Sequence, residues 1–257
     1  MTVALYEKRE RIAYITLNRP EALNALDDAL NEALWAIWQD FEHDESVDVA
    51  ILTGNGKAFC AGADLKTFIP KWEKATLLDA RRNLDKGIGG GLTRGQHRIR
   101  KPVICAINGH AIGGGFELAL ACDIRIAAEH AEFGVFEVRQ GLHQGDGGLV
   151  RLLAIAGTAV ALDLTLTGRE VLADEALRLG LVNRVVPADQ VMSTAESYAR
   201  MILGNSQHAV RSAKETILDL IGRELEDALR LETLNAYAAD FDDVRARLEH
   251  FFNRAKQ

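Results

Sequence analysis

Cysteine is scarce in this chain, which has three cysteines among its 257 residues. The number is odd, and neither a CxxC pair nor a Cys/His spacing typical of metal ligands occurs, so no disulfide framework and no metal site are predicted. Cys105 and Cys122 lie in apolar runs and are expected in the core. Cys60 lies beside a loop to which we assign function below, but only this proximity suggests a nucleophile.

An excess of basic residues is also lacking. The formal net charge is -7, from 30 Lys and Arg against 37 Asp and Glu. This balance argues against non-specific nucleic-acid binding, and we find no basic stripe with interleaved aromatics. No basic segment followed by an apolar one opens the chain, and no apolar run approaches the roughly 20 residues that span a bilayer. We therefore expect a cytoplasmic protein without a membrane partner.

The residues that are present predict an α/β fold. The length is sufficient for a large core, and 48% apolar and 26% charged residues are typical of a soluble enzyme. Residues 12–17, 47–53 and 102–108 are expected as strands, and a helix is expected after Asp27 and Asp28, which can cap it. Strands separated by helices indicate βαβ units.

From about Gly147 onward, helical patterns dominate. One amphipathic face is clear after Ser206, and two further helices are expected near residues 225–238 and 242–252. We predict a core over residues 1–195 and a helical C-terminal part over 196–257 that packs on the core or on another subunit.

Three consecutive glycines give the strongest functional signal. They lie in the run 112–117, between the expected strand at 102–108 and the helix formers at 118–121. Glycines at such a junction let the backbone approach a ligand, and the first N–H groups of a helix favour negative charge. Glu117 is then placed to handle a proton. A tight turn would also explain the glycines, whereas GxxxxGK[ST] and GxGxxG do not fit here.

The segment around these glycines resembles the core signature of the crotonase (enoyl-CoA hydratase/isomerase) superfamily. The resemblance extends over nearly the whole chain, in the family's order, through the segments NRPEALNAL (18–26), GKAFCAGADL (56–65), KPVICAINGHAIGGGFELALACDIRIAAEHAEFGVFEVRQGL (101–142) and LTGREVLADEALRLGLVNRVVP (166–187). It implies a spiral core of ββα units with a helical C-terminal part, assembled as a homotrimer or as a homohexamer made of two trimers.

The resemblance also implies the chemistry. The N–H groups of Ala63 and Gly114 would stabilise a thioester enolate. The Glu117 position would act as the base on water and the Glu137 position would deliver a proton to the α-carbon. Retention of both carboxylates favours an enoyl-CoA hydratase, a carbon–oxygen lyase of fatty acid metabolism that uses coenzyme A as part of its substrate and needs no other cofactor. An enoyl-CoA or dienoyl-CoA isomerase and an acyl-CoA hydrolase remain alternatives.

The sequence departs from the family pattern after Glu137. Relatives usually carry Pro and Ala where this chain has Gln144 and Asp146. Asp146 could be a third acid in the pocket, but we favour an N-cap for the helix near Gly147. His143 could reach the site, although a loop histidine is more often solvated.

Coenzyme A contacts are likewise implied by the resemblance. Main-chain contacts are expected near residues 22–24 and 61–65, and Lys66 is a candidate phosphate partner. A phenylalanine near the C-terminus, often from a neighbouring subunit, is best matched by Phe251, with Arg254 a weak match for the accompanying lysine. The expected coenzyme A-binding residues are Ala22, Asn24, Ala61, Asp64, Leu65, Lys66 and Phe251.

Overall fold

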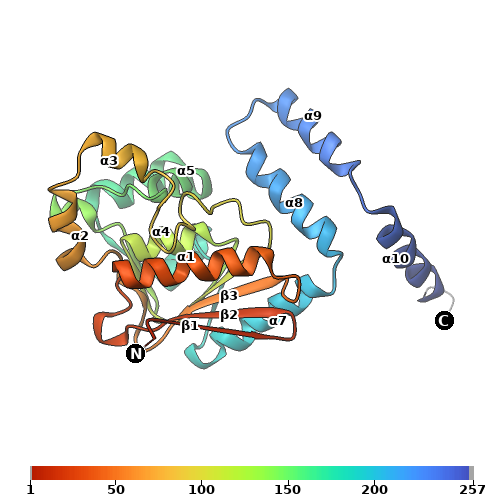
Figure 1. Ribbon diagram of the computed structural model, residues 1–257, viewed down its shortest axis with the longest axis horizontal. Coiled ribbons are helices and arrows are strands. Elements are labelled where there is room, and N and C mark those ends of the chain that lie inside the picture. Colours follow the sequence, from red (N-terminus) through yellow and green to blue (C-terminus); the bar gives the residue numbers. More distant parts are fainter. Residues whose placement is uncertain (1, 255–257) are drawn as a thin grey trace.

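Two β-sheets form the body of the computed structural model, which describes residues 2–254 (Figure 1). The larger sheet has the order β1-β2-β3-β5-β7-β10 and is parallel except for β1. The smaller sheet has the order β4-β6-β8-β9, with β9 antiparallel. The strands are β1 (Ala4–Arg9), β2 (Ile12–Leu17), β3 (Val49–Gly54), β4 (Ala58–Cys60), β5 (Val103–Ile107), β6 (His110–Ile112), β7 (Ile124–Ala128), β8 (Glu132–Gly134), β9 (Glu170–Leu172) and β10 (Arg184–Val186).

Successive strands from β3 to β8 alternate between the two sheets, so the chain advances as a spiral of strand pairs with helices between them. The α/β class predicted from the sequence is confirmed. The helices are α1 (Asp28–His43), α2 (Leu65–Trp72), α3 (Leu77–Arg82), α4 (Gly114–Ala121), α5 (Gly148–Thr167), α6 (Ala173–Arg178), α7 (Val191–Leu203), α8 (Gln207–Leu220), α9 (Leu225–Ala236) and α10 (Phe241–Arg254), with 3-10 turns at η1 (Pro20–Ala22), η2 (Glu137–Gln140) and η3 (Ala188–Gln190).

Local sequence explains β2 and α1. Nearly every residue of β2 is buried, which is typical of a strand covered on both faces. The Asp27 side chain accepts the Leu30 N–H and caps α1, as predicted. Trp38 and Phe41 project from the buried face of α1 and are fully enclosed. Each such aromatic contributes about 1.5–3 kcal/mol through burial of apolar surface.

The segment between α3 and β5 is more buried than its polar composition predicts. Ile88, Leu92 and Ile99 point into the core. Gly90, with φ +67°, approaches α1 so closely that a Cβ there would lie 2.4 Å from a Leu34 backbone atom. The Trp38 indole N–H donates to the carbonyl of Gly89 over 2.8 Å. Glycine thus allows this loop to lie against a helix.

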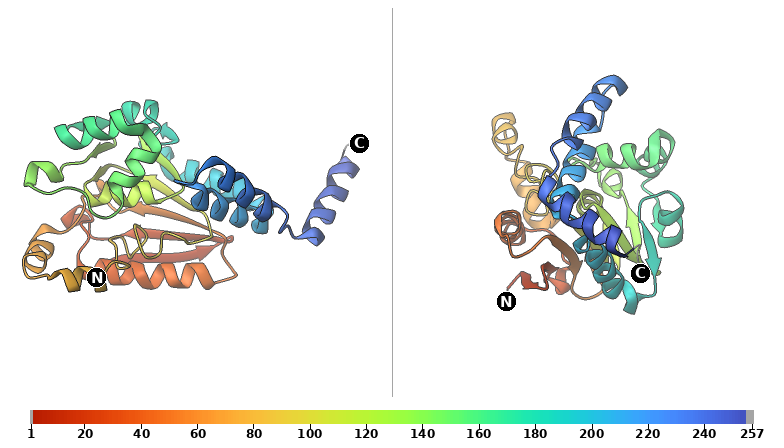
Figure 2. Two further views of the ribbon diagram at one scale, coloured as in Figure 1. Left: turned by 90° about the horizontal axis from the view of Figure 1, so that it is seen from above. Right: turned by 90° about the vertical axis from the view of Figure 1, so that its right-hand side faces the viewer.

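Helix α7 belongs to the core, and a helical arm follows it. Val191, Ala195 and Ala199 of α7 are buried, and the helix packs on β3, β5 and β7. The expected division after residue 195 therefore falls inside a core helix. The arm begins at α8 and extends away from the sheets through α9 and α10 (Figures 1 and 2). Arg254 ends α10 and its side chain lies outside the described residues.

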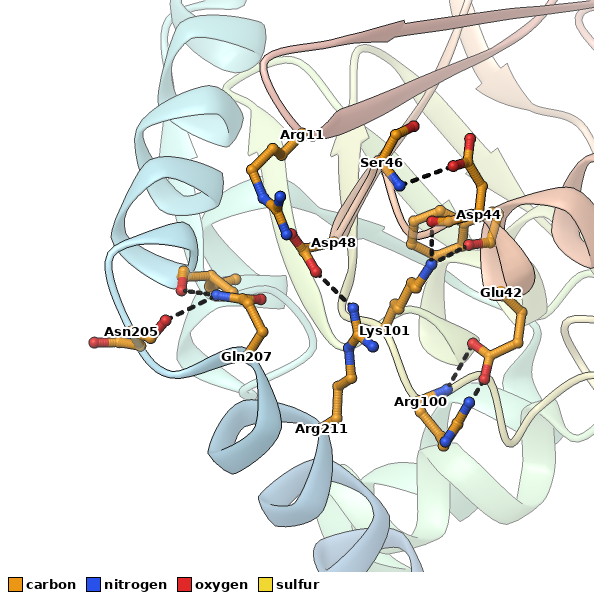
Figure 3. Close-up of polar contacts among 12 residues, drawn as sticks. Arg11, Glu42, Asp44, Ser46, Asp48, Arg100, Lys101, Asn205, Gln207 and Arg211 are labelled. Carbon is orange, nitrogen blue, oxygen red and sulfur yellow. Dashed lines mark hydrogen bonds and ion pairs between the residues drawn. The ribbon is translucent and has the colours of Figure 1, made fainter. Parts of the chain in front are cut away.

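Ion pairs hold α8 to the N-terminal edge of the parallel sheet. Asp48, directly before β3, is 1% exposed. It contacts Arg11, directly before β2, and Arg211 on α8 (Figure 3). Lys214, one turn along α8, lies 2.6 Å from the carboxylate of Asp123, directly before β7. Two contacts one helical turn apart fix the direction in which the arm leaves the core.

Helix α5 is long and apolar enough to cross a membrane by length and composition alone, contrary to the expectation that no such run exists. Its backbone is not continuous, because Gly157 has φ 77° and ψ 171° and divides it into two shorter helices. Neither half approaches the roughly 20 residues of a membrane span. Exposed apolar side chains on α5 include Val150 and Leu166.

We predict that Asp48→Asn lowers the free energy of unfolding by about 1–3 kcal/mol, because it removes the charge that two guanidinium groups share at a buried position. Urea unfolding followed by circular dichroism measures the loss. Asp227→Asn is the matched control, since Asp227 pairs with Arg230 at the surface, where its side chain is 67% exposed; its effect should stay within about 0.5 kcal/mol. Equal effects of the two substitutions would contradict the anchoring role of Asp48.

Candidate active site

The candidate site lies where three neighbouring parallel strands of the smaller sheet end. Strand β4 ends at Cys60, β6 at Ile112 and β8 at Gly134. The residues that follow them carry the expected oxyanion donors and both candidate carboxylates. Because the carboxyl ends of parallel strands meet at one edge of a sheet, the topology brings together groups that are distant in the sequence.

Helix α4 starts at this edge. Gly113 has φ 54° and ψ -125°, which favours glycine, and its N–H donates to the carbonyl of Gly134 over 2.9 Å. The helix begins at Gly114, whose N–H has no acceptor within residues 2–254. A Cβ on Gly115 would lie 2.0 Å from the carbonyl oxygen of Cys60. Only glycine therefore permits this contact between α4 and β4.

Ala63 lies beside Gly114. A Cβ on Gly62, which has φ +95°, would lie 3.0 Å from the Gly114 nitrogen, and one on Gly114 would lie 3.3 Å from the Ala63 nitrogen. The Ala63 N–H, like that of Gly114, finds no acceptor in the part of the chain that the structure describes. Two adjacent unpaired N–H groups can stabilise an oxygen that becomes negative.

Glu117 projects from the first turn of α4 and is 3% exposed. Its Oε1 accepts the N–H groups of Asp146 and Gly148, each over 2.9 Å. Burial, followed by the negative charge of Asp146, raises the pKa of Glu117 to about 7, while the two N–H donors oppose this rise. The carboxyl group can therefore accept or release a proton near neutral pH.

Glu137 begins the 3-10 turn η2 just after β8. Its Oε1 lies 3.0 Å from the position that a Cβ on Gly113 would occupy, so the carboxylate faces the start of α4. Burial raises the pKa of Glu137, and the nearby Gln144 carboxamide partly opposes the rise. Its Oε2 is buried and has no hydrogen-bond partner within residues 2–254. Glu137 and Glu117 are close enough for the charge of Glu137 to raise the pKa of Glu117 further.

Gln144 is a member of this site that the sequence did not identify. It is 3% exposed, and a Cβ on Gly148 would lie 2.3 Å from its Oε1 and 2.6 Å from Cγ of Glu117. The available signal was a polar residue, seven residues after Glu137, at a position where the family pattern to which the sequence was compared has proline.

Asp146 does not cap α5, and the expectation that it does is wrong. Gly147, with φ 86°, occupies the cap position without a side-chain hydrogen bond. The Asp146 carboxylate instead lies 2.9 Å from Nε of Arg94 and accepts the Ile88 N–H over 3.2 Å. It is thus held by the loop between α3 and β5.

Ile88 and His143 complete the surroundings. A Cβ on Gly114 would lie 2.6 Å from Cδ1 of Ile88, so this side chain covers the start of α4. His143 is exposed, and its Nδ1 lies 2.7 Å from the carbonyl oxygen of Gln144. It matches a solvated loop histidine and not a site residue.

Several of the residues expected to bind coenzyme A lie near Ala63. Asn24 is fully buried, and its side-chain amide donates to the carbonyls of Asn55 and Ala58. Its main chain is engaged as well, since its N–H donates to the carbonyl of Arg19. The Ala61 N–H donates to the carbonyl of Leu23, which joins the two expected segments. Ala22 ends η1 on the first of these segments.

The start of α2 holds the remaining expected residues of this region. Asp64 caps α2 by accepting the Lys66 N–H and also pairs with Arg19 over 3.2 Å. Leu65 is half exposed. Lys66 lines a shallow surface cleft between α2 and α3 together with Lys71 and Lys74. The side chain of Asp64 is thus engaged in structure, whereas that of Lys66 is exposed and has no ion-pair partner within residues 2–254.

Phe251 lies far from these residues. It is on α10, 65% exposed, and packs against Phe252 with ring centroids 5.6 Å apart. The structure does not bring it to the site of its own chain. A contribution to a neighbouring subunit stays a prediction.

Cys60 is a buried thiol and not a nucleophile. Burial raises its pKa to about 12, and its Sγ–H donates to the carbonyl of Asn24 over 3.2 Å. Over residues 2–254, no cluster of three or more His, Cys, Asp or Glu side chains is arranged to hold a metal ion.

Comparison with known proteins gives a consistent result. The sequence matches the enoyl-CoA hydratase/isomerase family over residues 7–257. It is 41% identical to a short-chain-enoyl-CoA hydratase of Clostridium acetobutylicum, over 98% of this chain and 95% of that protein. It is 42% identical to a probable mitochondrial enoyl-CoA hydratase of Dictyostelium discoideum, over 88% and 79%. The solved structure of an enoyl-CoA hydratase from Bacillus anthracis superposes with a TM-score of 0.87 at 35% identity, over 98% and 96% of the two chains.

We predict that Glu117→Gln stabilises the protein at high pH. The pKa of Glu117 is about 7 in the folded state against 4.5 for a solvated glutamate. Because the folded pKa is raised, the wild type loses stability relative to the variant as the pH rises from about 4.5 to about 7. The gap should reach about 3 kcal/mol above this window and vanish below it. Urea unfolding at several pH values measures it, and a gap independent of pH would contradict the assignment.

We also predict that Asp146→Asn lowers the pKa of Glu117, since it removes a nearby negative charge while keeping the acceptor for the Ile88 N–H. Titration of the side-chain carboxyl carbon by 13C NMR measures the midpoint, and the Glu117→Gln protein assigns the signal. An unchanged or higher midpoint would show that Asp146 does not act on Glu117.

Proposed function

This chain belongs to the enoyl-CoA hydratase/isomerase family, and we propose that it is an enoyl-CoA hydratase, a carbon–oxygen lyase that reversibly adds water across the 2,3 double bond of a 2-enoyl-CoA thioester. One observation carries the proposal: the buried Glu117 and the half-buried Glu137 lie beside the N–H groups of Ala63 and Gly114, which have no acceptor within residues 2–254. Relatives that are named as hydratases, and that match this chain over most of their length, support the proposal.

In the proposed reaction, the thioester oxygen accepts the N–H groups of Ala63 and Gly114. Glu117 takes a proton from water while the water oxygen bonds to C3, and the electron pair of the double bond moves onto the thioester oxygen as an enolate. The carbonyl then re-forms as C2 takes a proton from Glu137. Exchange with solvent returns Glu117 and Glu137 to their starting protonation states. A pKa of Glu117 near 7 suits both directions of a reversible proton transfer.

Isomerase or hydrolase chemistry is less well supported. The reason for considering it was Asp146 as an additional acid, and the Asp146 carboxylate is engaged by Arg94 and the Ile88 N–H. Water addition uses two acid–base groups, and Glu117 and Glu137 can supply them.

The coenzyme A part of the substrate would be held by the main chain around residues 22–24 and 61–65, with Lys66 meeting a phosphate. Neither a metal nor a redox cofactor has a step in this mechanism. Consistent with the acidic net charge of -7, we assign no nucleic-acid partner, and we assign no membrane partner. Three buried free cysteines fit a reducing cytoplasmic location, and fatty acid metabolism is the corresponding pathway class.

Assembly as a homotrimer, or as two trimers, is part of the proposal. Exposed apolar side chains are frequent on the arm and include Ile217, Leu225, Leu234 and Phe251. Large apolar side chains left exposed along a helical arm are consistent with a protein interface. In such an assembly, Phe251 would reach the nucleotide of a neighbouring subunit.

We predict that the wild type removes the conjugated-thioester absorbance of crotonyl-CoA with a gain of one water in the product mass. Glu117→Gln and Glu137→Gln should each lower kcat by about 10²–10⁴ because each removes a general acid–base group. Glu129→Gln, on the exposed turn after β7, is the control and should retain full activity. Full hydratase activity in Glu117→Gln or Glu137→Gln would refute the mechanism, and a shifted double bond without added water would indicate an isomerase.

A further inference from the structure

Gln144 has an arrangement that packing alone does not explain. It is among the few polar side chains that the core encloses, at 3% exposure. Both carboxamide atoms, Oε1 and Nε2, are buried and find no hydrogen-bond partner in the described range 2–254. A buried amide is normally hydrogen-bonded, because its desolvation is otherwise uncompensated. An amide held in this way points to a ligand that it binds.

The surroundings of Gln144 identify the kind of ligand. Its Oε1 lies against Gly148 and beside Cγ of Glu117, since a Cβ on Gly148 would meet both. The carboxamide also lies close enough to Glu137 to lower the pKa of that residue. Gln144 is therefore next to both carboxylates that the proposed reaction uses.

The backbone groups nearby are already engaged. The N–H groups of Asp146 and Gly148 both donate to Oε1 of Glu117. The buried polar atoms left without a partner at this place are the two of the Gln144 carboxamide and Oε2 of Glu137. The Nε2 atom carries two N–H donors, and the two oxygens are acceptors. A small hydrogen-bonding molecule can satisfy these groups.

We propose that Gln144 is a third residue in contact with the reacting water, an inference that rests on the proposed hydratase function. Its Oε1 accepts one hydrogen of the water while Glu117 accepts the other, so that a lone pair of the water oxygen faces C3 of the substrate. Gln144 thus orients the nucleophile and does not itself exchange a proton.

If Gln144 orients the reacting water, its loss should slow the hydration step without weakening the binding of an acyl-CoA. Gln144→Met keeps the length of the side chain and removes both the donor and the acceptor. We expect kcat for crotonyl-CoA hydration to fall about 10- to 100-fold, as for the loss of a hydrogen bond to a charged or reacting group. The Kd of butyryl-CoA, a saturated analogue that takes up no water, should stay within about twofold of the wild-type value.

Gln140→Met is the matched control, because Gln140 ends the neighbouring turn η2 and is exposed. It should change neither value. Unchanged kcat in Gln144→Met would overturn the proposal. A parallel loss of kcat and of butyryl-CoA binding would also overturn it, because Gln144 would then support the acyl pocket or the local fold. Failure of the hydratase proposal is a separate result, since the wild type itself would then not hydrate crotonyl-CoA.

Discussion

The contact between the first turn of α4 and the connection from β4 to α2 is the constraint on which the site depends. At Gly62 and Gly115, a Cβ would lie within 3 Å of backbone atoms of the opposite segment. Because no side chain separates these two segments, the N–H groups of Ala63 and Gly114 lie side by side at the ends of neighbouring strands. The parallel small sheet fixes both segments, so the donors are positioned before any substrate arrives.

The same close packing sets the electrostatics of the site. It removes Glu117 from water, which favours its neutral form, and the charge of Asp146 acts in the same direction. Two backbone N–H groups near the start of α5 donate hydrogen bonds to Glu117 and oppose both effects. The result is a carboxyl group near the midpoint of its titration at neutral pH. Such a buried acid weakens the fold at high pH, which is a common cost of placing proton-transfer groups in a core.

Sequence patterns predicted what is determined locally. The strand β2, the capped helix α1 and the amphipathic α8 follow from periodicity and caps that lie within each segment. Asp146 was misassigned because a cap is also a local inference, whereas its partners, Arg94 and Ile88, lie on a loop far away in the sequence. That loop carries polar residues and glycines, and its burial depends on close contact with α1, which no periodicity reveals. Gln144 was missed for the same reason, because the two carboxylates beside it, Glu117 and Glu137, lie on other elements.

Polar contacts fix the orientation of the C-terminal arm, which its apolar faces alone do not determine. The apolar face of α8 predicted a helix that packs on the core or on another subunit. Apolar contact is non-directional, however, and permits several orientations of the helix. Arg211 and Lys214 on α8 meet Asp48 and Asp123, which precede parallel strands of one sheet. The amino ends of those strands lie at the edge opposite their carboxyl ends, so an ion-paired helix must cross there and can leave the core in only one direction. The arm thereby exposes its apolar residues away from the sheets, where another chain can cover them.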